Sequence, residues 1–423
     1  MQLKTILNRV EHYKSFVYGK VQWVEDAERL TLEVEVLARA NSRPICSGCG
    51  RPGPGYDRLP PRRFEFVPLW QIAVFLVCAP RRVQCSRCGV KVEQLPWADS
   101  KCHLTTSYRW FLAGWARRLS WQQTATAFQT TWEHVRDAVK HAVFWGIVHR
   151  DLTGVEAIGV DEVQWQRGHK YLTLVYQIDA KCKRLLWIGK ERTTASFRGF
   201  FQTLGAPVAA GLQYVCSDMW KPYLEVIAEQ APDAIHILDR FHIMARMNKA
   251  IDEVRAAEAR RLKQDGYEPV LKHSRWCLLK RPENRTGPQE VKMQELLKYN
   301  LQSVRAHLQR EDFQRFWEYQ SPAWAGKFLD QWCRQVMRSQ IEPMKKVART
   351  IRNHRELILN WFEARGTMSS GVVEGLNNKV KLTTRKAYGF RTEEAVKLAL
   401  YHNLGGYCAS RSVNASVASG SSA

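Results

Sequence analysis

The stretch VEAIGVD at residues 155–161 decides the fold of the larger part of this chain, because a strand pattern there runs directly into a carboxylate. Two more strand patterns, a helical pattern and a fourth strand pattern follow, at 170–178, 184–189, 195–204 and 214–218. The fourth strand, YVCSD, also ends in an aspartate. Strands avoid aspartate, and a lone carboxylate is costly to bury in an apolar segment. Asp161 and Asp218 therefore indicate a site where carboxylates bind a metal ion.

Three strands, a helix and a fourth strand follow one another in the order of the RNase H fold. In that fold the first and fourth strands are neighbours, so we expect Asp161 and Asp218 to reach one metal site. A helix predicted to begin near Ser369 carries Glu374, which would complete the site. Before this helix, the sequence at about 243–364 is basic and helical, which predicts a helical insertion in the α/β domain.

Other residues near these acids have weaker claims to the site. Alternation along the first strand turns Glu162 to the face opposite Asp161. Asp239 ends a fifth strand pattern, and we expect Asp239 and His242 to support the site as second-layer residues. A direct catalytic role for Asp239 is the alternative. His236 and His242 are poorly spaced for a metal pair, so we expect partly buried, hydrogen-bonded histidines.

Four of the eleven cysteines form two matching pairs, CSGC at 46–49 and CSRC at 85–88, each followed by a glycine. Each pair directs two thiolates at one tetrahedral ion, and the glycine permits the tight turn. Strand-prone residues at 64–77 predict a hairpin between the pairs, which favours a zinc ribbon with one structural Zn²⁺. The predicted ligands are Cys46, Cys49, Cys85 and Cys88. Four ordinary buried cysteines are the alternative.

Beyond the second cysteine pair, the apolar period becomes helical. The predicted elements are a short helix, a turn and a longer helix, at 120–128, 129–131 and 132–145. Ser120 is a good N-cap for the short helix. This succession is typical of a helix-turn-helix unit, whose last helix would present Arg136 and Lys140 to DNA. A three-helix packing unit with a solvated charged face is the alternative.

The composition favours a polyanionic partner. Lys and Arg number 64 against 41 Asp and Glu in 423 residues, which gives a net charge of +23. A membrane partner is disfavoured, because the longest apolar run, at 66–79, is interrupted by Pro68 and Gln71 and is too short to span a bilayer. No signal-peptide pattern begins the sequence, so we expect a cytoplasmic protein with reduced thiols.

Several motifs together resemble the ISL3 family of insertion-sequence transposases, within the class that uses two aspartates and one glutamate. Apart from the cysteine pairs, they are IGVDE at 158–162, SDMWKPY at 217–223, DRFH at 239–242, ARTIRNH at 348–354 and VEGLNN at 373–378. The resemblance covers nearly the whole chain. One departure is the Ser369–Ser370 pair, where the family pattern has an asparagine.

The resemblance implies a bacterial DNA transposase with Asp161, Asp218 and Glu374 as catalytic residues. Two Mg²⁺ or Mn²⁺ ions on these carboxylates would serve phosphodiester hydrolysis and then attack of the freed 3′-hydroxyl on target DNA. The ribbon and the helix-turn-helix would bind the terminal inverted repeats of the element. Because two element ends must be joined in concert, we expect a homodimer or a higher oligomer on double-stranded DNA.

A basic segment follows Glu374. Its cations would hold DNA phosphates near the metal ions, and the alternative is a solvated basic helix face. They are Lys381, Arg385, Lys386 and Arg391.

The predicted architecture is an α+β multidomain chain. Its domains are a zinc-ribbon domain at 1–100, a helix-turn-helix domain at 101–150, an RNase H-like catalytic domain at 151–405 with the helical insertion, and a disordered tail at 406–423. Two other functions fit part of the pattern: a DNA-binding regulator descended from a transposase, and a nuclease that cuts without joining.

Overall fold

The computed structural model of the protein describes residues 2–25, 27–99, 102–364 and 371–406. The chain divides into two compact units, one of residues 1–150 with 381–423 and one of residues 151–380. Residues 381–406, predicted to lie in the catalytic domain, pack in the first unit. The predicted tail and the Ser369–Ser370 pair lie outside the described residues, apart from Gly406. None of the helices in the described ranges is long and apolar enough to cross a membrane.

The first unit begins with a four-stranded sheet in the order β1-β2-β5-β4. Its elements are α1 (Leu3–Val10), β1 (Phe16–Trp23), β2 (Thr31–Ala38), β4 (Arg62–Leu69) and β5 (Ile72–Cys78). The hairpin predicted at 64–77 forms as β4 and β5, with Trp70 and Gln71 in left-handed turn conformations. The hairpin pairs with β2 through β5 and not with the cysteine strands, because its alternating apolar residues complete the core around Val34 and Trp97.

A separate three-stranded sheet carries one cysteine pair and part of the ribbon. Its strands are β3 (Gly55–Arg58), β6 (Arg81–Cys85) and β7 (Gly89–Val92), in the order β3-β6-β7. Cys85 ends β6 and Gly89 begins β7, so the CSRC turn is the tip of a β-hairpin. The first cysteine pair joins this sheet through a bridge between Cys46 and Glu93. The ribbon therefore consists of the segments on either side of the β4–β5 hairpin.

Four helices complete the first unit. They are α2 (Thr106–Ala116), α3 (Trp121–Ala127), α4 (Trp132–Val148) and α16 (Glu393–Leu404). The predicted cap is confirmed: Ser120 and Gln123 form a reciprocal capping box at the start of α3. The apolar faces share one core that includes Leu112, Val139 and Leu398. The short helix, the turn and the longer helix lie where the sequence predicts them.

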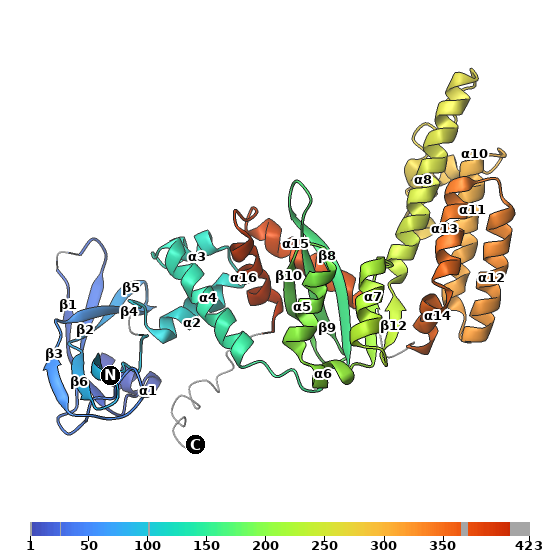
Figure 1. The fold of residues 1–423 in the computed structure, drawn as a ribbon. Helices are drawn as coiled ribbons and strands as arrows, with labels where there is room; N and C mark the ends of the chain where they lie inside the picture. The colour runs from blue at the N-terminus through green and yellow to red at the C-terminus, as the bar shows by residue number, and fades with distance from the viewer. Residues whose placement is uncertain (1, 26, 100–101, 365–370, 407–423) are drawn as a thin grey trace. The chain divides into compact units, whose positions relative to one another are not determined.

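The second unit is built on a five-stranded mixed sheet in the order β10-β9-β8-β11-β12 (Figure 1). Its strands are β8 (Ala157–Gln166), β9 (Lys170–Ile178), β10 (Lys183–Lys190), β11 (Tyr214–Ser217) and β12 (Ile235–Leu238). The first three strands are antiparallel, whereas β11 pairs in parallel with both β8 and β12. The first and fourth strands of this unit are thus neighbours, as predicted.

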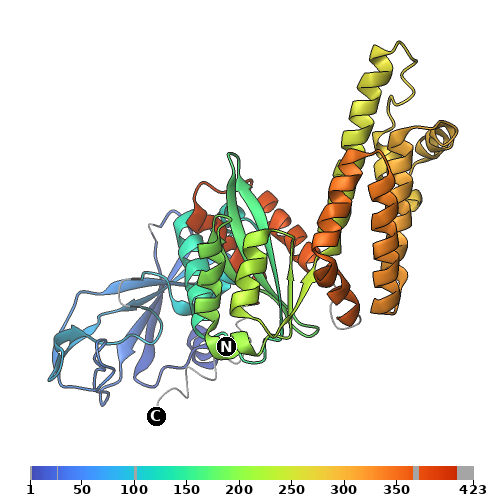
Figure 2. The ribbon, with the colours of Figure 1, turned by 45° about the vertical axis from the view of Figure 1, so that its right-hand side comes forward.

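Helices cover both faces of this sheet (Figure 2). Three helices lie against one face, α5 (Thr194–Leu204), α6 (Ala206–Ala210) and α7 (Lys221–Gln230). Ile158, Val160 and Val215 point into that core. The other face receives α15 (Gly371–Lys386), which approaches β8 so closely that a Cβ at Gly159 would stand 2.5 Å from Val373. Glycine at position 159 therefore sets how near α15 comes to the sheet.

The predicted insertion is confirmed as helical and begins directly after β12. It comprises α8 (Arg240–Gln264), α9 (Arg275–Leu279), η1 (Pro282–Asn284), α10 (Gly287–Leu296), α11 (Gln302–Gln314), η2 (Arg315–Glu318), α12 (Pro322–Arg338), α13 (Glu342–Asn353) and α14 (Arg355–Glu363). These helices bury their own apolar core around Met247, Phe313 and Trp332. The last helix returns to the sheet, where Asn360 Nδ2 donates a 2.8 Å hydrogen bond to the carbonyl of His236 on β12.

Candidate active site and metal centre

Three aspartates stand at one level of three neighbouring strands. Tyr214 on β11 lies opposite both Ala157 on β8 and Ile235 on β12. Four residues further along each strand, this register brings three carboxylates to the same level, those of Asp161, Asp218 and Asp239. Parallel pairing therefore gathers acids that lie far apart in the sequence.

Asp161 is held by hydrogen bonds on both carboxylate oxygens. Its Oδ1 accepts a 2.7 Å bond from the N–H of Glu162, and its Oδ2 accepts a bond from Nδ2 of Asn377. The hydroxyl of Tyr176 in turn donates to Asn377 Oδ1 at 2.8 Å. Burial raises the pKa of Asp161, while the N–H of Glu162 lowers it. The Asp161 carboxylate is thus mostly buried, and its hydrogen bonds fix its orientation.

Asp239 follows β12 and begins the helical insertion as the N-cap of α8, accepting a 2.9 Å bond from the N–H of Phe241. His242 stands between two of the acids, with Nε2 at 3.9 Å from Asp161 Oδ1 and 3.9 Å from Asp239 Oδ2. Burial raises the pKa of Asp239, and the neighbouring charges of Asp161 and Glu374 raise it further. Asp239 and His242 thus lie beside Asp161, and their supporting role stays a prediction. His236 is buried against Ser217 at 2.7 Å, consistent with the structural role expected for it.

Asp218 has different partners. Its Oδ1 accepts a 2.9 Å bond from the N–H of Trp220, and its Oδ2 lies 2.9 Å from Nη2 of Arg192. The same guanidinium contacts Glu162, with Nε 2.8 Å from Oε1. Burial raises the pKa of Glu162 to about 7, whereas a hydrogen bond with Tyr223 and the charge of Arg192 lower it. Glu162 lies on the face opposite Asp161, as alternation predicts, and Arg192 links it to Asp218.

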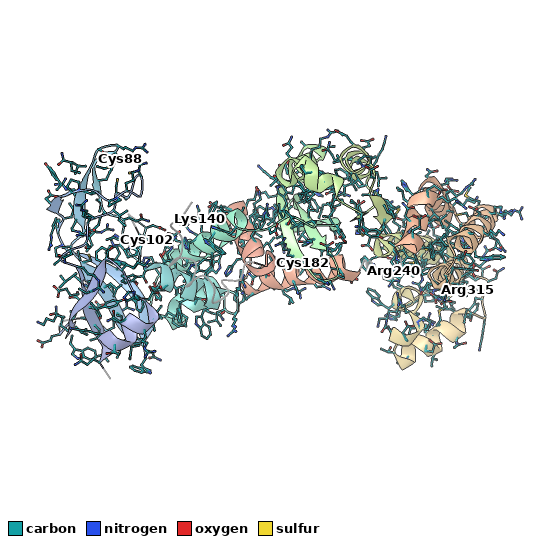
Figure 3. The ribbon with its side chains drawn as sticks, turned by 90° about the horizontal axis from the view of Figure 1, so that it is seen from below. Cys88, Cys102, Lys140, Cys182, Arg240 and Arg315 are labelled. Atoms are coloured by element: carbon teal, nitrogen blue, oxygen red, sulfur yellow. The ribbon has the colours of Figure 1, made fainter. Side chains whose placement is uncertain are left out.

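Glu374 lies exposed in the first turn of α15 and lines a cavity of about 330 Å³ together with Asp239. The wall of this cavity also includes exposed Arg240, at the start of α8 (Figure 3), and Arg281. Phe241, 53% exposed, contributes an aromatic side chain. The cavity therefore combines two carboxylates with two exposed guanidinium groups and one aromatic ring.

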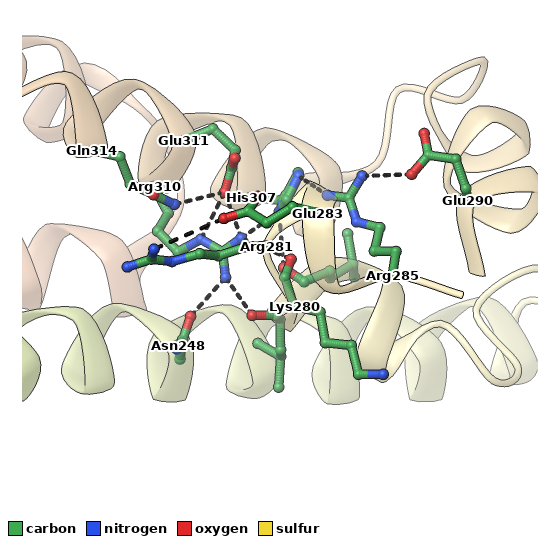
Figure 4. Close-up of polar contacts among 12 residues, drawn as sticks. Asn248, Lys280, Arg281, Glu283, Arg285, Glu290, His307, Arg310, Glu311 and Gln314 are labelled. Carbon is green, nitrogen blue, oxygen red and sulfur yellow. Dashed lines mark hydrogen bonds and ion pairs between the residues drawn. The ribbon is translucent and has the colours of Figure 1, made fainter. Parts of the chain in front are cut away.

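Arg310 also lines this cavity and is itself 2% exposed. Figure 4 shows its guanidinium between α8 and the chain before η1, where Nη1 donates to Asn248 Oδ1 at 2.7 Å and to the Leu279 carbonyl at 2.8 Å. His307 stands beside it and accepts from Arg285 at 3.2 Å. Arg310 thus fixes the backbone that precedes Arg281, because a guanidinium offers five donors in a rigid plane.

The carboxylates have the chemistry of a divalent-metal site but lie in two groups. Asp161, Asp239 and His242 form one group, and Asp218 lies with Arg192 and Glu162 in the other. Carboxylate oxygens are the ligands that Mg²⁺ and Mn²⁺ prefer, and buried neighbouring acids gain stability from a cation. Among the described residues, the acids do not form a group of three or more at metal-ligand spacing. The carboxylate oxygens are therefore the type of ligand that the predicted ions require, but these side chains do not lie close enough together to form a group of three or more ligands.

The four cysteines of the predicted zinc centre do come together. The sulfur atoms of Cys46, Cys49, Cys85 and Cys88 lie within 4.8 Å of one another. Gly50 and Gly89 both have φ 68°, the left-handed conformation that glycine adopts without strain. Backbone N–H groups of the second turn donate to Cys85 and lower its pKa to about 6. This arrangement can bind one tetrahedral Zn²⁺.

On the long helix α4, the two predicted DNA contacts have protein partners. Arg136 lies 3.2 Å from Asp137 and over the ring of Trp132. Lys140 Nζ lies 3.1 Å from Glu394 on α16. Both side chains are more than 40% exposed, and their spacing places them on one face of α4.

The basic residues after Glu374 differ in their surroundings. Lys381, Arg385 and Arg391 are exposed. Lys386 is half-buried, and its Nζ donates to the carbonyls of Ala116 and Arg117 at 3.2 and 2.9 Å. Burial also lowers the pKa of Lys386. Lys386 thus satisfies carbonyls at the end of α2, a structural role that its position in a basic run did not indicate.

Sequence reasoning missed two residues of the site. Arg192 lies in an ordinary polar turn after β10, and nothing in its local pattern connects it with two acids on other strands. Asn377 follows Glu374 by three residues on α15, but its hydrogen bond with Asp161 requires the packing of α15 on β8. Contacts between distant segments determine both roles.

Comparison with known proteins identifies the family to which this chain belongs. Residues 158–400 match a family model described as a transposase, of the DDE class. Because the match spans more than half of the chain, the chain belongs to the ISL3 family of transposases. Membership implies that the protein binds DNA and uses divalent metal ions.

Two curated relatives extend this match beyond the family model. The chain is 28% identical over 394 residues to the transposase for insertion sequence element IS1001 of Bordetella parapertussis, covering 92% of this chain and 96% of the relative. It is 29% identical over 391 residues to the transposase for insertion sequence element IS1557 of Mycobacterium tuberculosis, covering 85% of this chain and 86% of the relative. The similarity therefore includes most of the N-terminal region.

Proposed function

We propose that the protein excises or copies an insertion sequence by cleaving its ends and joining the freed 3′-hydroxyl to target DNA. The catalytic residues in this proposal are Asp161, Asp218 and Glu374, in an RNase H-like domain. The observation that carries it is the register that brings Asp161 and Asp218 to one level of neighbouring strands, with Glu374 on the helix packed against the same sheet. A DNA-binding transposase needs such a group of acids for phosphodiester chemistry.

In this mechanism the three carboxylates would hold two Mg²⁺ or Mn²⁺ ions. When bound, such ions lower the pKa of an attacking water and stabilise the leaving oxygen. Asn377 orients Asp161 through its hydrogen bond, and His242 lies between Asp161 and Asp239. Arg240 and Arg281 offer guanidinium groups to the DNA backbone beside Glu374. Water attacks first, and the 3′-hydroxyl attacks target DNA in the second step.

The first unit would recognise the element. A zinc ion on the four cysteines stabilises the ribbon, and the ribbon and the helix-turn-helix bind the terminal inverted repeats. Arg136 and Lys140 supply cations for this contact, as do Lys381, Arg385 and Arg391. Joining two ends in concert would need a homodimer or a higher oligomer, and the expected compartment is the bacterial cytoplasm.

The test is an incubation of the purified, zinc-loaded protein with Mg²⁺, a labelled duplex carrying the element's terminal repeat, and supercoiled target DNA. Nicked and joined products are both scored. Joined product is the expected result. Nicking without joining would support a nuclease, and repeat binding without either product would support a DNA-binding regulator.

A further inference from the structure

Arg192 bridges two acids that come from different strands. Its Nε lies 2.8 Å from Glu162 Oε1 on β8, and its Nη2 lies 2.9 Å from Asp218 Oδ2 after β11. The guanidinium also stacks over the ring of Trp220, with 4.4 Å between its Cζ and the ring centroid. Three contacts from three directions hold this one side chain, although it is 37% exposed.

Both oxygens of Asp218 have hydrogen-bond donors. One oxygen accepts the N–H of Trp220 and the other accepts Nη2 of Arg192. Asp161, at the same level of the neighbouring strand, is held instead by Asn377 and lies near His242. Arg192 therefore ties Asp218 to Glu162, which lies on the opposite face from Asp161.

A divalent ion and Arg192 compete for the same carboxylate. Both are cations that seek Asp218 Oδ2, and at a few ångströms they would repel each other. Arg192 can give up Asp218 without leaving its place, because Glu162 and Trp220 still hold it. A guanidinium stays charged at every physiological pH, so only an exchange of partners can free the carboxylate.

We propose that Arg192 is a clamp that holds Asp218 on Glu162 in the metal-free protein and releases it when a divalent ion binds. Arg192 is thus a positioning residue whose presence weakens metal binding. The inference rests on the proposed assignment of Asp218 as a metal ligand. It accounts for the separation of the acids into two groups, since the clamp keeps one of them turned away.

The experiment measures Mn²⁺ binding to the full-length, zinc-loaded protein without DNA, by electron paramagnetic resonance of free Mn²⁺ and by calorimetry. Arg192→Gln should bind Mn²⁺ roughly three- to tenfold more tightly than the wild type, the effect of removing one partly exposed ion-pair partner. Arg192→Lys should lie between them, because a lysine is a point charge that cannot bridge both acids. Arg198→Gln is the matched control, since Arg198 pairs with Glu229 at 2.6 Å on α5 and α7.

The double variant tests whether Arg192 weakens Mn²⁺ binding through Asp218. In an Asp218→Asn background, Arg192→Gln should no longer tighten Mn²⁺ binding. If Arg192→Gln binds Mn²⁺ as tightly as the wild type or less tightly, with an unchanged thermal unfolding profile, the clamp is wrong. If the glutamine variant unfolds, the same comparison is made between Arg192→Lys and the wild type.

The two proposals fail in different ways. If Asp218→Asn weakens Mn²⁺ binding while Arg192→Gln leaves it unchanged, the clamp is wrong and the metal assignment stands. If neither the wild type nor Arg192→Gln binds Mn²⁺, the metal assignment of the proposed function is wrong, and the clamp falls with it.

Discussion

A metal site needs several ligand atoms close together, and the thiols and the carboxylates of this protein differ in how closely the fold gathers them. Four sulfur atoms lie within 4.8 Å of one another, although they come from two turns some forty residues apart. Asp161 and Asp218 stand on neighbouring strands, yet their side chains turn to different partners. The four thiols are gathered in the folded chain, whereas the carboxylates of the described residues are not.

Charge explains this difference. Thiols pack against one another at little cost, and backbone N–H groups and neighbouring thiols stabilise the thiolate of Cys85, so the fold alone can gather four sulfur atoms. Carboxylates repel one another when ionised and lose hydration when buried, so each takes the nearest cation or N–H group. Arg192 beside Asp218 and the side-chain amide of Asn377 beside Asp161 are those neighbours here. A preassembled site suits a structural ion, and a divided site suits ions that arrive with the substrate.

The largest effect is expected from Asp161→Asn. The substitution keeps the shape of the side chain but removes the negative charge at the centre of the site, so cleavage should fall by roughly 1,000-fold or more. Binding to the terminal repeat should remain, because the first unit is unaltered. Gel-shift and nicking assays measure the two quantities, with exposed Asp233→Asn as control. Equal loss of binding and cleavage would contradict the separation of the two sites.

Cys49→Ser should show the reverse behaviour. We expect loss of the bound zinc and a fall of roughly 100-fold in affinity for the terminal repeat, since a ribbon without its ion loses its fold. Metal analysis and gel shifts measure this, and Cys182→Ser, in a loop of the second unit, is the control. Retained zinc in Cys49→Ser would mean that the cysteines do not form the site.

Asn377→Ala removes the side chain that orients Asp161. Cleavage should fall by roughly 10- to 100-fold, the usual cost of losing a residue that holds a metal ligand. The adjacent Asn378 is exposed, so Asn378→Ala keeps the helix and tests the specificity of the effect. Nicking rates over a range of Mg²⁺ concentrations separate lost metal affinity from lost rate. Equal effects of the two substitutions would point to a general weakening of α15.

The smallest effect concerns stability and pH in the metal-free protein. Because the pKa of Glu162 is raised to about 7, its protonated form stabilises the fold at low pH, and this contribution is lost as pH rises through about 7. Glu162→Gln should therefore gain about 2 kcal/mol relative to the wild type between about pH 5 and about pH 7. Urea unfolding at several pH values measures this gain, with Glu225→Gln as control. A constant difference between variant and wild type would show that Glu162 does not titrate there.

The sequence predicted elements well where local patterns decide them. The N-cap at Ser120, the cysteine turns and the strand that leads to Asp161 all depend on residues close in the chain. The β4–β5 hairpin was also predicted, but its sheet was not, because pairing with β2 is a contact between segments forty residues apart. Helical residues after 380 pack in the first compact unit, and that packing also depends on contacts between segments far apart in the chain.

The candidate site shows the same limit. Aspartates in or directly after strand patterns are visible in the sequence, although Asp161 lies within β8 and not at its end, and topology then places Asp161 and Asp218 on neighbouring strands. Arg192 and Asn377 act on these acids from other elements, and Lys386 is used to cap a helix far away in the chain. Which cation pairs with a given acid depends on tertiary packing, and the local sequence pattern does not indicate it.

The return of α14 to β12 bears on how the second unit folds. Asp239 and Glu374 are separated by the entire helical insertion, and closing so long a flexible loop would delay formation of the sheet. The insertion, however, has its own apolar core, and Asn360 ties its last helix to the strand from which its first helix departs. Once the insertion has folded, its two ends are neighbours, and the chain between the acids behaves kinetically as a short connection.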